Sequence, residues 1–170
     1  RCAGGVHVDA AASTIDLEPG VRLDLGGIAK GYAADRAAAI LAGAGACLVD
    51  AGGDVVAHGR PWPVGVETGD GTLTLEVAAG AIATSGRDRR RWTRAGEEQH
   101  HLIDPATGRP ADGDLLRVTV VASTAAEAEV LAKTLFLAGA AGALEEAERD
   151  AIPAVLVTLD GRTLLTGSLA

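Results

Sequence analysis

The feature of this chain that most constrains its fold is a series of short β-rich runs separated by glycine-containing turns. Turn signals such as Asp70-Gly71 and Asp160-Gly161 stand between runs of Val, Ile, Leu and Thr. Strands are therefore expected at 13–17, 47–49, 55–58, 62–68, 73–77, 81–84, 117–122, 152–159 and 163–166. Because most of these runs are joined by short turns rather than by helical crossovers, the pattern predicts an α+β fold with a largely antiparallel sheet.

Two regions of the chain favour helix and are expected to pack against that sheet. The Ala-rich segment 28–41 is the first. The second begins at Thr124-Ala125-Ala126-Glu127, which has the form of a capping box, and runs to about Ala138 before Gly139 stops it. A further helix is expected over 141–149, whereas the polar, charged stretch 85–100 is expected to be a loop.

Length and charge exclude some classes of protein. The 170 residues favour one domain, and a hydrophobic content of 48% is enough to build a core. A net charge of -8 argues against nucleic-acid binding, which needs a surplus of Lys and Arg. No transmembrane segment is expected, because no apolar stretch approaches the roughly 20 residues that a helix needs to cross a bilayer.

The segment from Asp24 to Gly31 is the first candidate site. Two glycines lead into a helix start, where unsatisfied backbone N–H groups and the helix dipole favour an anion. Lys30 lies in the first helical turn, so a phosphate group would suit this place. The spacing matches neither a Rossmann fingerprint nor a Walker A motif, however. The residues alone equally allow a tight strand-to-helix turn with a solvated lysine.

Three more stretches carry candidate chemistry, each with an alternative. The glycines of Asp50-Ala51-Gly52-Gly53-Asp54 would let backbone approach a ligand, although a bulged turn between strands is the favoured interpretation. Ala83-Thr84-Ser85-Gly86 with the basic run 87–91 suits either an anionic ligand or a solvated loop. His101 could be a general base or a ligand contact, whereas a lone histidine is more often structural.

Glu129 and Lys133 lie four residues apart on the helix that follows the capping box. The helical period places them together, on the side opposite an apolar face formed by Val130, Leu131, Thr134, Leu135 and Ala138. Glu before Lys at this spacing is the favourable order for an ion pair. The favoured interpretation from spacing alone is an ordinary exposed pair.

Taken in order, five stretches resemble the ApbE family, the FAD:protein FMN transferases. They are D-L-G-G-I-A-K-G-Y-A-A-D from Asp24, D-A-G-G-D from Asp50, A-T-S-G from Ala83, H-L-I-D-P-A-T-G-R-P from His101, and V-T-V-V-A with A-E-A-E-V-L-A-K-T-L-F from Val118. Each stretch alone is weakly specific, but the five in order cover nearly the whole chain. The resemblance implies an ApbE-like α+β fold in one domain, residues 1–170, that lacks the family's N-terminal segment.

The resemblance also implies a reaction and a set of site residues. Proteins of this family split FAD at its pyrophosphate and attach FMN to a Thr or Ser of an acceptor flavoprotein, with Mg²⁺ neutralising the pyrophosphate. The flavin site would include Asp24, Lys30, Thr84, Ser85 and Leu102. His101 would assist deprotonation of the acceptor hydroxyl as the catalytic residue. The metal ligands would be the backbone carbonyl of Gly27, the Glu129 side chain and the backbone carbonyl of Ala132.

This chain departs from the family pattern at the metal stretch. Glu129 stands in place of an Asp, and Lys133 in place of a metal-binding Thr. A protonated lysine cannot ligate, so its ammonium is expected where Mg²⁺ would sit, paired with Glu129. Two alternatives to a transferase stay open: a non-catalytic flavin-binding relative with a degraded metal site, and an FAD pyrophosphatase. An extracytoplasmic or membrane-associated location is expected from the resemblance.

Overall fold

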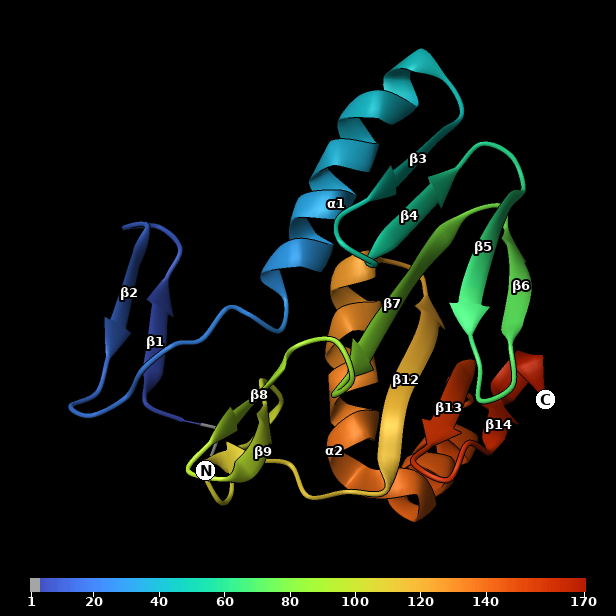
Figure 1. The fold of residues 1–170 in the computed structure, drawn as a ribbon. Helices are drawn as coiled ribbons and strands as arrows, with labels where there is room; N and C mark the ends of the chain where they lie inside the picture. Colours follow the sequence, from blue (N-terminus) through green and yellow to red (C-terminus); the bar gives the residue numbers. More distant parts are fainter. Residues whose placement is uncertain (1–3) are drawn as a thin grey trace.

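The computed structural model describes residues 4–170 and confirms an α+β fold with antiparallel pairing (Figure 1). Its main sheet has six strands in the order β14-β13-β12-β7-β4-β3. Every neighbouring pair in it is antiparallel. The strands are β3 (Cys47–Asp50), β4 (Val55–His58), β7 (Gly80–Gly86), β12 (Leu115–Ala122), β13 (Ala154–Thr158) and β14 (Thr163–Thr166). Each of them contains or overlaps a run that the sequence predicts as a strand.

The helices also follow the prediction. Helix α1 spans Ala29–Leu41 and continues into the short 3-10 turn η1 (Ala42–Ala44). Helix α2 spans Ala125–Arg149, and the Thr124 side chain caps it by accepting a hydrogen bond from the Glu127 N–H. Gly139 interrupts α2 with a φ of 71°, which divides the element where the sequence predicts a stop. A second 3-10 turn, η2 (Gly167–Leu169), ends the chain.

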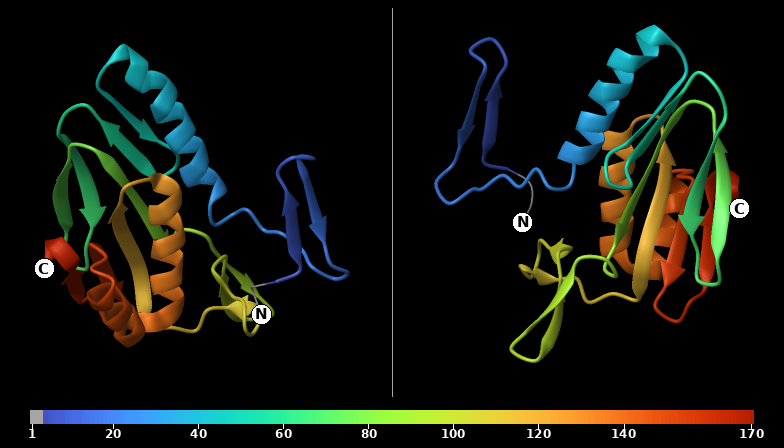
Figure 2. Two further views of the ribbon diagram at one scale, coloured as in Figure 1. Left: turned by 180° about the vertical axis from the view of Figure 1, so that it is seen from behind. Right: turned by 45° about the horizontal axis from the view of Figure 1, so that its top comes forward.

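Both helices cover the same face of the sheet (Figure 2). The main core lies between α2 and the strands β12 and β13, and its members include Leu115, Val118, Leu135, Phe136 and Leu156. A smaller cluster joins α1 to β4 and β7 through Ala34, Ala38, Val56 and Ala81. Small residues in this cluster allow α1 to approach the sheet closely.

A hairpin covers part of the opposite face. Strands β5 (Trp62–Glu67) and β6 (Thr72–Val77) pair with each other rather than with the main sheet. Val77 packs there against Ala57 and Ile82. Exposed residues alternate with less exposed ones along β6, which is the pattern expected of a half-buried strand.

Three small hairpins lie outside the main sheet. Strands β1 (Val6–Asp9) and β2 (Thr14–Leu17) pair in a hairpin that stands away from the main body (Figures 1 and 2). Strands β10 (Ile103–Asp104) and β11 (Arg109–Pro110) form a short pair. The third hairpin, β8 (Arg91–Arg94) with β9 (Glu97–His100), corrects the prediction of a loop at 85–100. None of the helices in the region 4–170 is long and apolar enough to cross a membrane.

The buried face of α2 differs from the predicted one. Val130 is 42% exposed, and Thr134 and Ala138 are also exposed, whereas Glu129 is only 4% exposed. The inward face is built largely from small residues, Ala125, Ala128 and Ala132, which let the helix lie close to β7 and α1. Residue size and the available polar partners, rather than hydrophobicity alone, therefore decide which face of α2 is buried.

Candidate functional site

A cleft of about 460 Å³ opens beside β7, where the pairing with β4 ends. Strand β4 pairs with β7 only from Gly80 to Ile82. The following residues Ala83–Gly86 pair with β12, and Thr84, Ser85 and Gly86 border the cleft. Its remaining walls are the start of α1, the turn after β3, the β5 strand, the loop 88–90 and the face of α2 at Glu129 and Lys133. Except for Asp24 and the metal-site residues Gly27 and Ala132, the predicted site residues all line it.

Lys30 binds two carboxylates in this cleft. Its Nζ lies 2.5 Å from Asp54 Oδ2 and 3.4 Å from Glu129 Oε1. Helix α1 places Lys30 in its first turn, and the turn after β3 supplies Asp54. Site prediction missed Asp54, although it closes the Asp50-Ala51-Gly52-Gly53-Asp54 turn that the sequence singles out. Lys30 therefore ties the start of α1 to both β4 and α2.

Asp54 is almost completely buried, with 1% of its surface exposed. Burial raises its pKa above the usual 3.8, the nearby charges of Glu129 and Asp50 add to that rise, and the Lys30 ammonium opposes it. The ammonium is thus the group that makes an ionised carboxylate tolerable at this place.

Glu129 has partners for both of its carboxylate oxygens. Oε2 accepts a hydrogen bond of 3.0 Å from the Gly31 N–H, and Oε1 faces the Lys30 ammonium. Gly31 is required here because a Cβ on it would lie 2.4 Å from the Ala125 carbonyl oxygen, too close for any side chain. The absence of a side chain at residue 31 lets α1 and α2 meet, and that contact brings Glu129 to Lys30.

Lys133 does not form the ion pair expected from its spacing. Its Nζ donates instead to the Gly26 carbonyl oxygen at 3.3 Å. A Cβ on Gly27 would lie 2.5 Å from the same Nζ, so the glycine leaves the room that the ammonium occupies. The prediction that Lys133 pairs with Glu129 is wrong because Glu129 turns into the interface between the helices, where Lys30 and the Gly31 N–H are its partners.

Asp24 shapes the glycine turn rather than facing the cleft. Its Oδ1 accepts a hydrogen bond of 2.8 Å from the Gly26 N–H, two residues further along. The Gly26 carbonyl oxygen, in turn, faces Lys133. Asp24 thereby holds the turn whose carbonyl oxygen receives the ammonium.

The two adjacent histidines have different environments. His100 is buried: its Nε2 lies 3.0 Å from the Ala111 carbonyl oxygen, and its Nδ1 accepts from the Leu102 N–H. His101 lines the cleft, with Nδ1 3.4 Å from the Arg90 carbonyl oxygen. Burial lowers the pKa of His101 below its usual 6.5, the hydrogen bond to the Arg90 carbonyl oxygen opposes that shift, and the positive charges of Arg90 and Lys133 lower the pKa further. His101 is therefore the neutral imidazole of this site near pH 7.

The other predicted flavin contacts differ in exposure. Thr84 is exposed, and its hydroxyl shares a hydrogen bond of 2.8 Å with the Thr119 hydroxyl. Ser85 borders the cleft but is buried, and Leu102 is a member of the main core that reaches the cleft wall. Thr84 is thus the polar group of this trio with access to a ligand.

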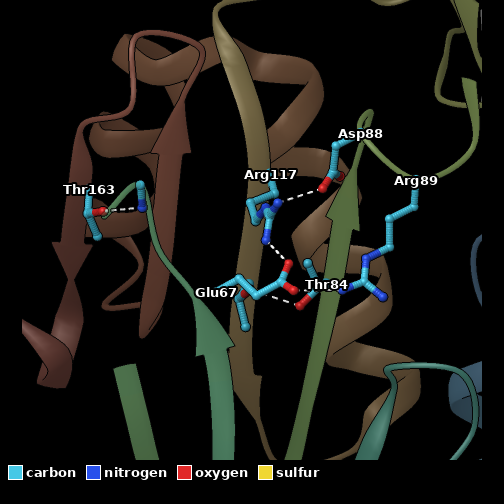
Figure 3. Close-up of polar contacts among 8 residues, drawn as sticks. Glu67, Thr84, Asp88, Arg89, Arg117 and Thr163 are labelled. Carbon is cyan, nitrogen blue, oxygen red and sulfur yellow. Dashed lines mark hydrogen bonds and ion pairs between the residues drawn. The ribbon is translucent and has the colours of Figure 1, made fainter. Parts of the chain in front are cut away.

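A charged network of residues that line the cleft joins β5, β12 and the loop after β7 (Figure 3). Arg117 on β12 donates to Glu67 on β5 and, at 2.5 Å, to Asp88, while Arg89 donates to Glu67 at 2.9 Å. Hydrogen bonds from Arg89 and Arg117 lower the pKa of Glu67. The basic run 87–91 signals part of this network in the sequence, but nothing there signals Arg117 or Glu67. The network ties the β5–β6 hairpin to the main sheet.

The side chains of the cleft do not by themselves form a set of metal ligands. Within residues 4–170, no three side chains of the types His, Cys, Asp and Glu converge as metal ligands. Of the predicted metal residues, Ala132 is fully buried, Gly27 lies against the Lys133 ammonium, and Glu129 has both oxygens engaged. The cleft therefore offers an anion two lysines, a neutral imidazole and a hydroxyl.

Comparison with known proteins shows which family this chain resembles. The model of the ApbE family matches residues 4–156. A Treponema pallidum protein named FAD:protein FMN transferase is 34% identical over 155 residues, covering 79% of this chain and 43% of the relative. An Escherichia coli protein of the same name is 31% identical over 160 residues, covering 87% of this chain and 46% of the relative. The chain thus spans about half the length of the curated relatives it matches.

Solved structures show the same fold. The ApbE protein of Thermotoga maritima superposes with a TM-score of 0.84 at 32% identity, covering 96% of this chain and 57% of that one. The flavinyl transferase ApbE of Pseudomonas stutzeri, in its apo form, gives a TM-score of 0.81 at 28% identity, covering 95% and 53%. The expected ApbE-like fold is confirmed.

Proposed function

Because the chain belongs to the ApbE family, we propose that it carries the transfer site of an FAD:protein FMN transferase. In this proposal, FAD binds with its pyrophosphate in the cleft and FMN passes to a Thr or Ser hydroxyl of an acceptor flavoprotein. The observation that supports it is the convergence of Lys30, Lys133 and His101 on one cleft from three separate parts of the chain. An extracytoplasmic or membrane-associated location is proposed with it.

The charges of the cleft suit the bound pyrophosphate. Phosphoryl transfer spreads negative charge over the phosphate oxygens, so cations positioned beforehand lower the barrier. The Lys133 ammonium lies at the glycine turn before α1, and Lys30 lies one helical turn further along. Lys30 also has two carboxylate partners, which leaves Lys133 as the lysine with the stronger field toward a ligand.

His101 is placed to accept the proton of the acceptor hydroxyl. If its Nδ1–H donates to the Arg90 carbonyl oxygen, Nε2 is left as the base. The hydroxyl oxygen forms a bond to the phosphorus on the FMN side, the bond to the bridging oxygen breaks, and AMP leaves. The pKa of His101, lowered by burial and by neighbouring cations, keeps the imidazole neutral and ready to accept that proton.

The residues of the cleft do not fit the Mg²⁺ that the family resemblance implies. Such a site needs oxygen donors at about 2.0–2.1 Å in near-octahedral geometry. Glu129 already bonds the Gly31 N–H and faces Lys30, and the Lys133 ammonium lies beside Gly27. The transfer step above is accordingly written with the side chains of this chain alone.

The test is incubation with FAD and a peptide that carries an acceptor threonine, followed by mass measurement. The expected result is a peptide heavier by one FMN moiety, with release of AMP, and loss of both products in His101→Ala. AMP and FMN released without labelled peptide would show an FAD pyrophosphatase instead. Bound FAD that is never cleaved would show a flavin-binding relative, and either result would refute the transferase.

A further inference from the structure

The two lysines of this chain have unequal partners in the cleft. Lys30 faces two carboxylates, those of Asp54 and Glu129. Lys133 has a neutral partner, the Gly26 carbonyl oxygen at 3.3 Å, and within residues 4–170 no carboxylate lies within ion-pair distance of it. The charge of Lys133 is therefore the less compensated of the two, and Lys133 lines the cleft.

Several residues hold the Lys133 ammonium at this place. Asp24 fixes the turn by accepting from the Gly26 N–H, and the missing side chain of Gly27 makes the room. The positive charge of Lys133 also acts on His101, because it contributes to the lowered pKa of that imidazole. A lysine that merely covered an exposed helix face would need none of these features.

From this geometry we infer that the Lys133 ammonium is the cation that binds the pyrophosphate, so that the site works without a divalent metal. This inference rests on the proposed function, because the pyrophosphate is that of FAD. An ammonium offers three N–H donors to phosphate oxygens and needs no ligand set. A divalent cation at the same place would be repelled by two ammonium groups and would find Glu129 already engaged.

The inference is tested by FAD binding, followed by quenching of flavin fluorescence, in EDTA and in excess Mg²⁺. For the wild-type protein, the dissociation constants for FAD in the two buffers are expected to differ by less than twofold. Calorimetry with Mg²⁺ alone is expected to show no tight binding site. Lys133→Met is expected to weaken FAD binding at least tenfold in both buffers. Lys133→Thr, which offers a hydroxyl beside Glu129, is expected to bind weakly in EDTA and to regain affinity with Mg²⁺.

A matched control is Arg149→Met, which removes a positive charge from the exposed end of the same helix. Thermal unfolding of each variant separates a folding defect from a binding defect. The inference is overturned if Mg²⁺ raises the affinity of the wild type for FAD tenfold. It is also overturned if Lys133→Met binds FAD as tightly as the wild type.

A second probe, inorganic pyrophosphate, separates this inference from the proposed function. If pyrophosphate in EDTA binds the wild type but not Lys133→Met, the result supports Lys133 as the cation that binds pyrophosphate. If FAD nevertheless binds the wild type in neither buffer, only the proposed function fails. FAD and pyrophosphate that both require Mg²⁺ would leave the transferase standing and overturn the role of Lys133.

Discussion

The contact between α1 and α2 gives a sharp prediction at Gly31. Its backbone is helical, so helix propensity alone predicts that Gly31→Ala stabilises the protein by about 1 kcal/mol. The structure predicts the opposite sign, because the new Cβ would lie 2.4 Å from the carbonyl oxygen of Ala125 and 2.7 Å from the amide nitrogen of Ala126. These are backbone atoms, so the two helices must move apart rather than a side chain turn aside.

The magnitude follows from what that movement breaks. Overpacking costs about 1–3 kcal/mol, and losing the bond from the Gly31 N–H to the Glu129 carboxylate costs about 1.5–3 kcal/mol. After subtracting the gain in propensity of about 1 kcal/mol, we expect a net loss of about 1.5–5 kcal/mol in the free energy of unfolding. The assay is urea unfolding followed by circular dichroism, with Gly43→Ala as the control because a Cβ there meets no atom within 4 Å. Gly31→Ala at or above wild-type stability would refute this account of the helix contact.

Three further predictions concern the same region. Asp35→Ala removes the carboxylate that accepts from the Ala125 and Ala126 N–H groups at the start of α2, so urea unfolding should show a loss of about 2 kcal/mol; no loss would contradict this capping role. Glu129→Ala leaves Lys30 with Asp54 alone and the Gly31 N–H unpaired, and should cost about 3 kcal/mol in the same assay, with Glu129→Gln milder because its amide oxygen can still accept. Lys133→Met should raise the pKa of His101 toward 6.5, because a positive charge that disfavours imidazolium is removed, and a proton NMR titration of the imidazole that shows no change would contradict the proximity of the two groups.

Much of the fold could be predicted from the sequence because its strands carry local signals. The strands of the main sheet alternate with turn residues, and Gly139 ends the first part of α2 as expected. The β8–β9 hairpin was missed because β8 is exposed along its length and β9 begins with polar, exposed residues, so neither shows an apolar alternation. Its turn uses Ala95 and Gly96 with φ of 53° and 83°, a left-handed pair that Asn-Gly usually signals and Ala-Gly does not.

The candidate site could be predicted only in part because its contacts join distant segments. The motifs located Lys30, and the family pattern pointed to Glu129, but the bond between Gly31 and Glu129 spans 98 residues of sequence. Helical periodicity alone placed Glu129 on the exposed side of α2, since a carboxylate is normally solvated. Its burial depends on partners from α1 that no pattern within α2 can reveal.

The glycines that precede α1 lead to a last prediction, which links Gly27 to Lys133. Gly27 is not among the residues with a positive φ, yet a Cβ there would lie 2.5 Å from the Lys133 Nζ and 3.3 Å from its Cδ and Cε. The obstacle is the end of a flexible side chain, so Gly27→Ala should displace the ammonium from the Gly26 carbonyl oxygen with little loss of stability. We therefore expect Gly27→Ala to weaken FAD binding as Lys133→Met does.

The effects of Gly27→Ala and of a substitution at Lys133 on the free energy of FAD binding should not be additive. In a Lys133→Thr background the shorter side chain leaves the new methyl group unopposed, so Gly27→Ala should then have little further effect on FAD binding in EDTA. Residues in direct contact commonly show coupling energies of about 0.5–3 kcal/mol, which a double-mutant cycle on the FAD dissociation constants can resolve. Additive effects would mean that Gly27 acts on the flavin site through something other than the position of Lys133. Strong coupling would show that the second glycine of the Asp24 to Gly31 segment makes room for a cation.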